Sequence, residues 1–172
     1  MALDRQPTLV GPTLRVRPMA PGDLEGLYAV ASDPGIWEQH PDRERWRRDV
    51  FERYVADALA SGGAVVVETH DGEIIGASRY DGLDEAGGRV EIGWTFLARS
   101  RWGGPTNREL KDLMLDHAFG AVEVVVFRVG VDNRRSRRAV EKLGARLAGV
   151  EPDDRLGDHA VYELRAEDRA PA

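Results

Sequence analysis

The stretch from Arg101 to Asn107 separates a strand-like run that ends at Phe96 from a helix-like run, and it restricts the fold strongly. It contains Gly103 and Gly104, and two adjacent glycines let a backbone approach a ligand closely. A helix that begins near Asn107 presents unpaired N–H groups and the positive end of its dipole, which favour an anion. The stretch therefore predicts a phosphate-binding corner where a strand passes into a helix.

A second corner of the same kind follows downstream. A β-branched run from Val124 to Val131 precedes Asn133, and a helix-like run from Arg134 to Leu143 comes next. The start of this helix holds four arginines, which either bind phosphates or lie on a solvated face that pairs with acidic residues. Asn133 is also a good helix N-cap.

Hydrophobic periodicity over the rest of the chain predicts one α/β (α+β) domain with a mixed sheet. The expected strands are Leu14 to Pro18, Ala64 to Thr69, Glu73 to Tyr80, Gly88 to Phe96, Val124 to Val131 and Val161 to Leu164. The expected helices are Pro21 to Ala31, Asp42 to Ala60, Asn107 to Phe119 and Arg134 to Leu143. Asp71 and Gly72 predict a hairpin turn within an antiparallel meander. Thr106 with Glu109 predicts a capping box, and Trp46 is expected to face inward.

Composition narrows the function. The 172 residues are 42% hydrophobic and show no internal repeat, which predicts a single domain. A net charge of −6 argues against binding to nucleic acid or anionic membranes, although binding of nucleic acid through the arginine cluster stays an alternative. Without cysteine there is no disulfide, thiolate metal site or cysteine nucleophile, so any acyl transfer is expected to be direct. No leader or membrane-spanning run is visible, which predicts a cytoplasmic location.

These features together resemble the GNAT superfamily of N-acetyltransferases, and most closely its branch of ribosomal-protein N-terminal acetyltransferases. The resemblance extends from Leu14 to about Leu164. The residues that carry it are Val90 to Phe96, Trp102 to Gly104, Glu109, Lys111, Asn133, Ser136 and Glu141 to Ala145. It implies a GNAT-like sheet of about seven strands, splayed at the cofactor site and flanked by about four helices. It also implies one domain over residues 1–172, with a core over about 13–165 and a frayed tail.

The implied reaction is transfer of an acetyl group from acetyl-CoA to an amine. The implied cofactor-binding residues are Leu97, Trp102, Gly103, Gly104, Thr106, Asn107, Asn133, Ser136 and Arg137. The family's usual phosphate loop runs Gln or Arg, two residues, Gly, one residue, then Gly or Ala, and the chain departs from it: a start at Arg101 gives Gly104 and Thr106, and a start at Trp102 gives Pro105 and Asn107. Pro105 has no N–H to donate, so the pyrophosphate is expected at the amides of Gly103, Gly104, Thr106 and Asn107. The backbone after Phe96 is expected to stabilise the oxyanion. Ser136 is expected to protonate the leaving thiolate, unless it serves only as a helix-start residue.

Glu91 is the first candidate for the general base, because strand alternation would place it on one face with Gly93 and Thr95. The alternative is a structural glutamate paired with an arginine such as Arg79. His40 is the second candidate and His159 the third, and a chain of ordered water molecules would also serve.

Trp37 and His40 are expected to line the acceptor site if the resemblance holds, and Trp37 is otherwise a core aromatic. The acidic balance favours a cationic acceptor such as a peptide N-terminus, a polyamine or an amino-bearing small molecule. Homodimers are common in the family. A non-catalytic acyl-CoA sensor with the same fold is the alternative function.

Overall fold

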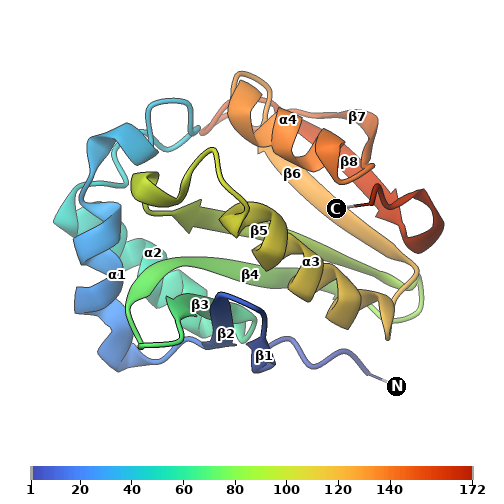
Figure 1. The fold of residues 1–172 in the computed structure, drawn as a ribbon. Helices are drawn as coiled ribbons and strands as arrows, with labels where there is room; N and C mark the ends of the chain where they lie inside the picture. Colours follow the sequence, from blue (N-terminus) through green and yellow to red (C-terminus); the bar gives the residue numbers. More distant parts are fainter. Residues whose placement is uncertain (1, 172) are drawn as a thin grey trace.

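The computed structural model describes residues 2–171 and is built on one sheet of eight strands (Figure 1). The strand order is β1-β2-β3-β4-β5-β6-β8-β7. The strands are β1 (Leu9–Val10), β2 (Leu14–Pro18), β3 (Ala64–Thr69), β4 (Ile74–Asp84), β5 (Arg89–Leu97), β6 (Val124–Gly130), β7 (Arg146–Glu151) and β8 (His159–Arg165). All neighbouring strands are antiparallel except β5 and β6, so the expected mixed sheet is confirmed.

Helices cover the two faces of the sheet, two on each side. The helices are α1 (Leu24–Ala31), α2 (Arg48–Ser61), α3 (Thr106–Phe119) and α4 (Arg134–Lys142). The apolar residues of α1 and α2 form one buried cluster with β3 and β4, and those of α3 and α4 form another on the opposite face. The fold therefore matches the expected GNAT architecture, with one strand more than expected. The two-residue β1 and the wholly exposed β7 lack the buried alternation by which strands are recognised.

The second helix begins later than expected. Periodicity predicts its start at Asp42, whereas α2 starts at Arg48, because Arg47 is the extended N-cap and residues 43–46 form turns. Because of this shift, Trp46 does not face inward as expected but is 38% exposed, and the neighbouring Arg45 is buried. The hairpin turn at Gly72 and the strands on either side of it are confirmed.

The start of α3 is stabilised in a different way from the expected capping box. Its N-cap is Pro105, and no side chain caps the helix. The Glu109 carboxylate instead accepts hydrogen bonds from the Thr13 amide at 2.8 Å, the Thr13 hydroxyl at 2.6 Å and the Leu14 amide at 3.2 Å. Glu109 therefore ties the turn before β2 to α3, a long-range contact that local spacing cannot reveal.

The C-terminal segment packs against the body of the molecule, although it was expected to fray from Arg165. The Ala170 amide donates to the Leu143 carbonyl at 2.8 Å, and Arg169 pairs with Asp112 and Asp116. Among the helices of residues 2–171, none combines the length and apolarity needed to cross a bilayer.

The sheet opens between its two parallel strands. Strands β5 and β6 pair only from Arg89 to Glu91 on β5 and from Val124 to Val126 on β6. Beyond Glu91, β5 continues to pair with β4 as far as Leu97, while its other edge has lost its neighbour. The two strands therefore separate directly after Glu91. The sequence had predicted this separation, and the backbone donors to the oxyanion, only after Phe96.

Candidate active site

A β-bulge in β5 lies at the start of this opening. Ala77 pairs with Phe96 and Arg79 with Gly93, so Ser78 alone faces both Trp94 and Thr95. Trp94 has a φ of 51°, and among the described residues it is the only non-glycine residue with a positive φ.

The bulge separates residues that simple alternation would place together. Trp94 packs with the cluster of α1 and α2, whereas the Thr95 hydroxyl accepts a hydrogen bond from Lys111 of α3 at 2.6 Å. The prediction that Glu91, Gly93 and Thr95 share one face is therefore wrong, because the extra residue turns Thr95 to the α3 side.

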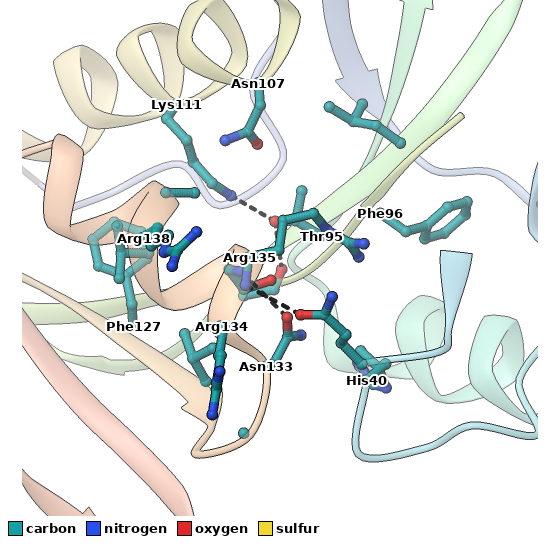
Figure 2. A pocket seen from close by; sticks show the side chains of 18 of the residues that line it. His40, Thr95, Phe96, Asn107, Lys111, Phe127, Asn133, Arg134, Arg135 and Arg138 are labelled. Carbon is teal, nitrogen blue, oxygen red and sulfur yellow. Dashed lines mark hydrogen bonds between the residues drawn. The ribbon is translucent and has the colours of Figure 1, made fainter. Parts of the chain in front are cut away.

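The opening forms a cleft of about 930 Å³ (Figure 2). Its walls are β5 from Ile92 to Leu97, the glycine corner, the first turns of α3 and α4, and the loop before α2. The cleft brings together these residues expected from the sequence: Trp37, His40, Leu97, Trp102, Gly103, Gly104, Asn107, Asn133, Ser136 and His159. It does not include Glu91, Thr106 or Arg137 in its lining.

The glycine corner is open toward solvent and the cleft. Gly103 has a φ of 71°, and a Cβ atom built on Gly103 or Gly104 would meet no atom within 4 Å. The first amide of α3 that closes an intrahelical bond is that of Glu109, which donates to the Pro105 carbonyl. The amides of the helix's first residues therefore remain available for an anion.

Helix α4 directs its arginines to two sides. Arg134, Arg135 and Arg138 line the cleft. Arg137 is turned away, because its guanidinium donates to the Tyr162 hydroxyl and to the Val131 carbonyl, each at 3.0 Å. The expected phosphate contact through Arg137 does not fit this placement. The Asn133 side chain caps the helix by accepting from the Ser136 amide at 3.2 Å, as expected for an N-cap.

Arg135 closes one end of the cleft. Its guanidinium carbon lies 3.7 Å from the centre of the Trp102 ring, and Nη2 donates to the Ile36 carbonyl at 3.3 Å. The indole of Trp102 in turn donates to the Leu97 carbonyl at 3.0 Å. Arg135 is therefore no solvated surface residue, and it connects the glycine corner to the loop before α2.

The cleft is strongly cationic although the whole chain is acidic. Its lining contains eight basic residues and a single acidic one, the exposed Asp132. The basic residues are Arg101, Arg108, Lys111, Arg128, Arg134, Arg135, Arg138 and Lys142. Such a concentration of positive charge on concave walls attracts an anionic ligand.

Lys111 is the functional candidate that the sequence reasoning did not single out. It is 5% exposed, and its ammonium group points into the middle of the cleft toward Thr95 (Figure 2). Burial lowers the pKa of Lys111 to about 7. Lys111 is among the residues that carry the family resemblance, and its place one position after Leu110, on the buried side of an amphipathic helix, is a second signal in the sequence.

The wall opposite α3 is aromatic. Trp37 is 2% exposed, and its indole donates to the Ala31 carbonyl at 2.8 Å, so it is a core residue as well as a cleft wall. The edge of His40 packs on Trp37 at 5.2 Å, and Nδ1 accepts from the Asp42 amide at 3.0 Å. Burial, with Arg45 beside it, lowers the pKa of His40 to about 3, so this ring is neutral.

Glu91 lies beside the cleft and is held by Arg128. Nη1 of Arg128 is 2.6 Å from the Glu91 carboxylate, and Nε of Arg128 is 2.9 Å from Glu151. Burial raises the pKa of Glu91, while Arg128 acts in the opposite direction. The alternative expectation, a glutamate paired with an arginine, is therefore confirmed, although the arginine is Arg128 and the example given, Arg79, pairs with Asp57 and Asp81.

Comparison with known proteins places this architecture in a family. Residues 13–146 match the acetyltransferase (GNAT) domain, and the chain belongs to this family. No curated protein sequence matches the chain.

Solved structures with this fold include three that are informative. A GCN5-related N-acetyltransferase from Brucella melitensis has a TM-score of 0.82 at 21% identity, over 95% of this chain and 80% of that one. RimJ from Mycobacterium smegmatis, in complex with CoA-disulfide, has a TM-score of 0.76 at 21% identity, over 99% and 93%. Spermidine N-acetyltransferase from Vibrio cholerae, in complex with CoA and spermine, has a TM-score of 0.71 at 17% identity, over 92% and 98%.

Proposed function

We propose that this protein is an acetyl-CoA-dependent N-acetyltransferase that transfers the acetyl group directly to a primary amine. The observation that carries the proposal is the cationic cleft between β5 and β6, with a glycine corner and a free helix N-terminus at its edge. Structures of the same fold hold CoA, one of them together with a polyamine, which supports this assignment.

The residues of the cleft suit a ligand with a diphosphate. The amides of Gly103, Gly104, Thr106 and Asn107 would hold the pyrophosphate, and Pro105 between them contributes none. Arg134 and Arg138 have no ion-pair partner within the described residues, so their charge is available to phosphate groups. Acetyl-CoA would supply an acetyl thioester next to the bulge.

Side chains near the bulge would supply the general base and the hydrogen bond to the leaving sulfur. Glu91 is our candidate for the general base, because its Oε1 lies 3.2 Å from the position of a Cβ atom on Gly93, a residue of the cleft wall. The Ser136 hydroxyl would hydrogen-bond the leaving sulfur. His40 is a weaker base than an ordinary histidine, because its pKa is about 3.

The acceptor would enter beside Trp37 and His40, on the aromatic wall. A primary amine fits the reaction, whether it belongs to a peptide N-terminus or to a small molecule. The chain's likeness to the ribosomal-protein branch favours the peptide N-terminus, and the likeness to the spermidine enzyme favours a small amine.

A thermal-shift titration with acetyl-CoA followed by a thiol-release screen across amines tests the proposal. A ligand present at 100 times its dissociation constant stabilises the native state by about 2.7 kcal/mol, or about 5 to 10 °C for a domain of this size. Since the chain contains no cysteine, every thiol released in the screen comes from CoA.

Two outcomes would contradict the proposal in different ways. No thermal shift with acetyl-CoA means that the cleft does not bind the cofactor. A shift without thiol release for peptide, polyamine and small-molecule amines means that the protein is a non-catalytic acyl-CoA sensor.

A further inference from the structure

The chain contains 24 basic residues, and only Lys111 and Lys142 among them are lysines. Lys142 is exposed at the end of α4, whereas Lys111 is buried in the cleft. An arginine keeps its proton at any physiological pH, but a buried lysine can lose it. A lysine at this position therefore supplies a property that the abundant arginines lack.

The surroundings of Lys111 hold its amine in place without neutralising it. Nζ donates to Thr95 Oγ1 at 2.6 Å, and Thr95 Oγ1 lies 2.8 Å from Ser78 Oγ. Both hydroxyls belong to the bulge, where Ser78 faces Thr95 across the β4–β5 pair. Within residues 2–171, no carboxylate lies within ion-pair distance of Nζ.

The charged and titratable groups that face the same cleft come from every element around Lys111. They are Arg101 at the corner, Arg108 on α3, Arg128 on β6, Asp132 before α4, Arg134, Arg135, Arg138 and Lys142 on α4, His40 in the loop and His159 on β8. Seven of these ten groups are arginines or lysines, and Asp132 is the one carboxylate. Burial lowers the pKa of Lys111 to about 7, so the amine changes its charge near neutral pH.

We propose that Lys111 donates the proton that the CoA sulfur takes up when the acetyl group leaves it. This inference rests on the proposed function. Lys111 reaches the bulge from the α3 side, behind the glycine corner, whereas the aromatic acceptor wall of Trp37 and His40 lies across the cleft. Its ammonium is thus on the side of the thioester's leaving group.

The step balances as follows. The amine nitrogen forms a C–N bond with the thioester carbonyl carbon, and the C–S bond breaks with its electron pair on sulfur. The Lys111 ammonium gives a proton to that sulfur and becomes a neutral amine. The nitrogen that becomes an amide releases one proton to the general base, which passes it to solvent, and the neutral Lys111 amine takes up one proton from solvent. Ser136 supplies a hydrogen bond to the same sulfur but has no ammonium proton to give.

The titration of the CoA thiol in its complex with the protein tests this directly, and it needs no knowledge of the acceptor. Free CoA is bound to the protein, and its thiolate is followed by ultraviolet absorbance from pH 6 to 9. The protein adds no thiol signal, because it contains no cysteine. The bound thiol and the Lys111 amine titrate as a coupled pair, in which the ammonium favours the thiolate and the thiolate favours the ammonium, as for cysteines beside lysine. The wild-type complex should therefore titrate below free CoA.

Lys111→Met removes the ammonium and retains the length of the side chain. We expect the pKa of the bound thiol to rise by about one unit, a tenfold loss of thiolate at a given pH, while the CoA dissociation constant changes by less than about threefold. Arg53→Met removes one positive charge from the exposed face of α2, outside the cleft, and should leave the thiol pKa within a few tenths of the wild-type value.

Thr95→Val removes the hydroxyl that holds Nζ and should move the thiol pKa in the same direction by a smaller amount. It carries the test if Lys111→Met does not fold, as judged by circular dichroism. An unchanged thiol pKa in the folded variants that still bind CoA would overturn the proposal. Acetylation of Lys111 itself by acetyl-CoA, detected by peptide mass, would overturn it too, because the amine would then be a nucleophile. If wild-type protein fails to bind CoA, the proposed function fails first.

Discussion

Glu91 is half-buried beside the Arg128 guanidinium, and its ionisation determines whether it can accept a proton. Burial raises the pKa of Glu91 above the usual value for a glutamate. Only the ionised carboxylate is a base, so wild-type kcat/KM should fall as the pH drops through this raised pKa. Glu91→Gln should lower kcat by about 100-fold and abolish the acid limb of the pH profile.

Glu151→Gln is the matched control for this prediction. Glu151 is the other carboxylate on Arg128, and it is exposed. Its loss should leave the acid limb in place. If Glu91→Gln retains the limb and most of the activity, the base is another group or water.

At the residue scale, the sequence predicted which residues line the cleft better than it predicted how β5 arranges its side chains. Gly103, Gly104, Asn107 and Asn133 follow from local rules about glycine corners and helix starts. The bulge at Trp94 does not, because it requires a positive φ at a bulky residue that no turn signal marks. Every residue after the bulge changes face, so alternation misplaced Thr95 relative to Glu91.

Helix α4 has one face toward the cleft and another toward β8. Two arginine variants, one on each face, distinguish a role in ligand binding from a role in stability. Arg138 faces the cleft, whereas Arg137 donates to Tyr162 and Val131. Arg138→Ala should weaken CoA binding by about tenfold, with a loss that shrinks at high salt, and leave the melting temperature unchanged. Arg137→Ala should lower stability by about 1 kcal/mol and leave CoA binding unchanged.

Calorimetric titration at two salt concentrations, with a denaturant melt of each variant, measures both effects. Exchanged behaviour of the two arginines would show that the phosphates lie on the Arg137 side. The sequence could not decide between them, because the helix phase depends on its first residue and neighbouring arginines point in different directions.

Helix α3 is joined to the turn before β2 through Glu109. Glu109→Gln weakens three hydrogen bonds from Thr13 and Leu14, so we expect a loss of about 1 to 2 kcal/mol in the free energy of unfolding, with unchanged CoA affinity. Urea denaturation checks it. Glu44→Gln removes an exposed pair with Arg47 and should cost less than about 0.5 kcal/mol. If Glu109→Gln and Glu44→Gln lower the free energy of unfolding by the same amount, Glu109 does not stabilise the protein through Thr13 and Leu14.

The boundaries of the elements show where sequence reasoning ends. The regular strands of the meander were predicted within a few residues, because each is an alternating or continuously apolar, β-branched run bounded by turn residues. The start of α2 was missed because residues 42–47 have helical periodicity, yet Arg45 turns inward over the ring of Tyr54, 4.8 Å from its centre. That cation–π contact depends on a distant side chain.

For the whole molecule, the acid side of the stability curve depends on a buried network. Burial would raise the pKa of Asp23, but hydrogen bonds from Arg17 and the Ala20 amide hold it below its model-compound value of 3.8. A carboxyl group with a lowered pKa in the folded state stabilises the protein above its unfolded pKa, and this contribution is lost as the pH falls.

The melting temperature should therefore fall as the pH decreases below about 4, and Asp23→Asn should reduce that decrease. Asp49→Asn, on the exposed side of α2, should leave the pH dependence as in wild type. Melting curves from pH 2.5 to 7 measure all three proteins. If the melting temperature of Asp23→Asn falls with decreasing pH as steeply as that of the wild type, other carboxyl groups control acid unfolding.

The whole chain carries a charge of −6, yet it concentrates eight basic side chains around one opening in its sheet. A crystal structure of the complex with acetyl-CoA examines this arrangement most directly. We expect the pyrophosphate at the amides of Gly103 to Asn107 and the thioester beside the bulge at Trp94. A cleft that stays closed by Arg135 on Trp102, with the cofactor absent or bound elsewhere, would contradict the account.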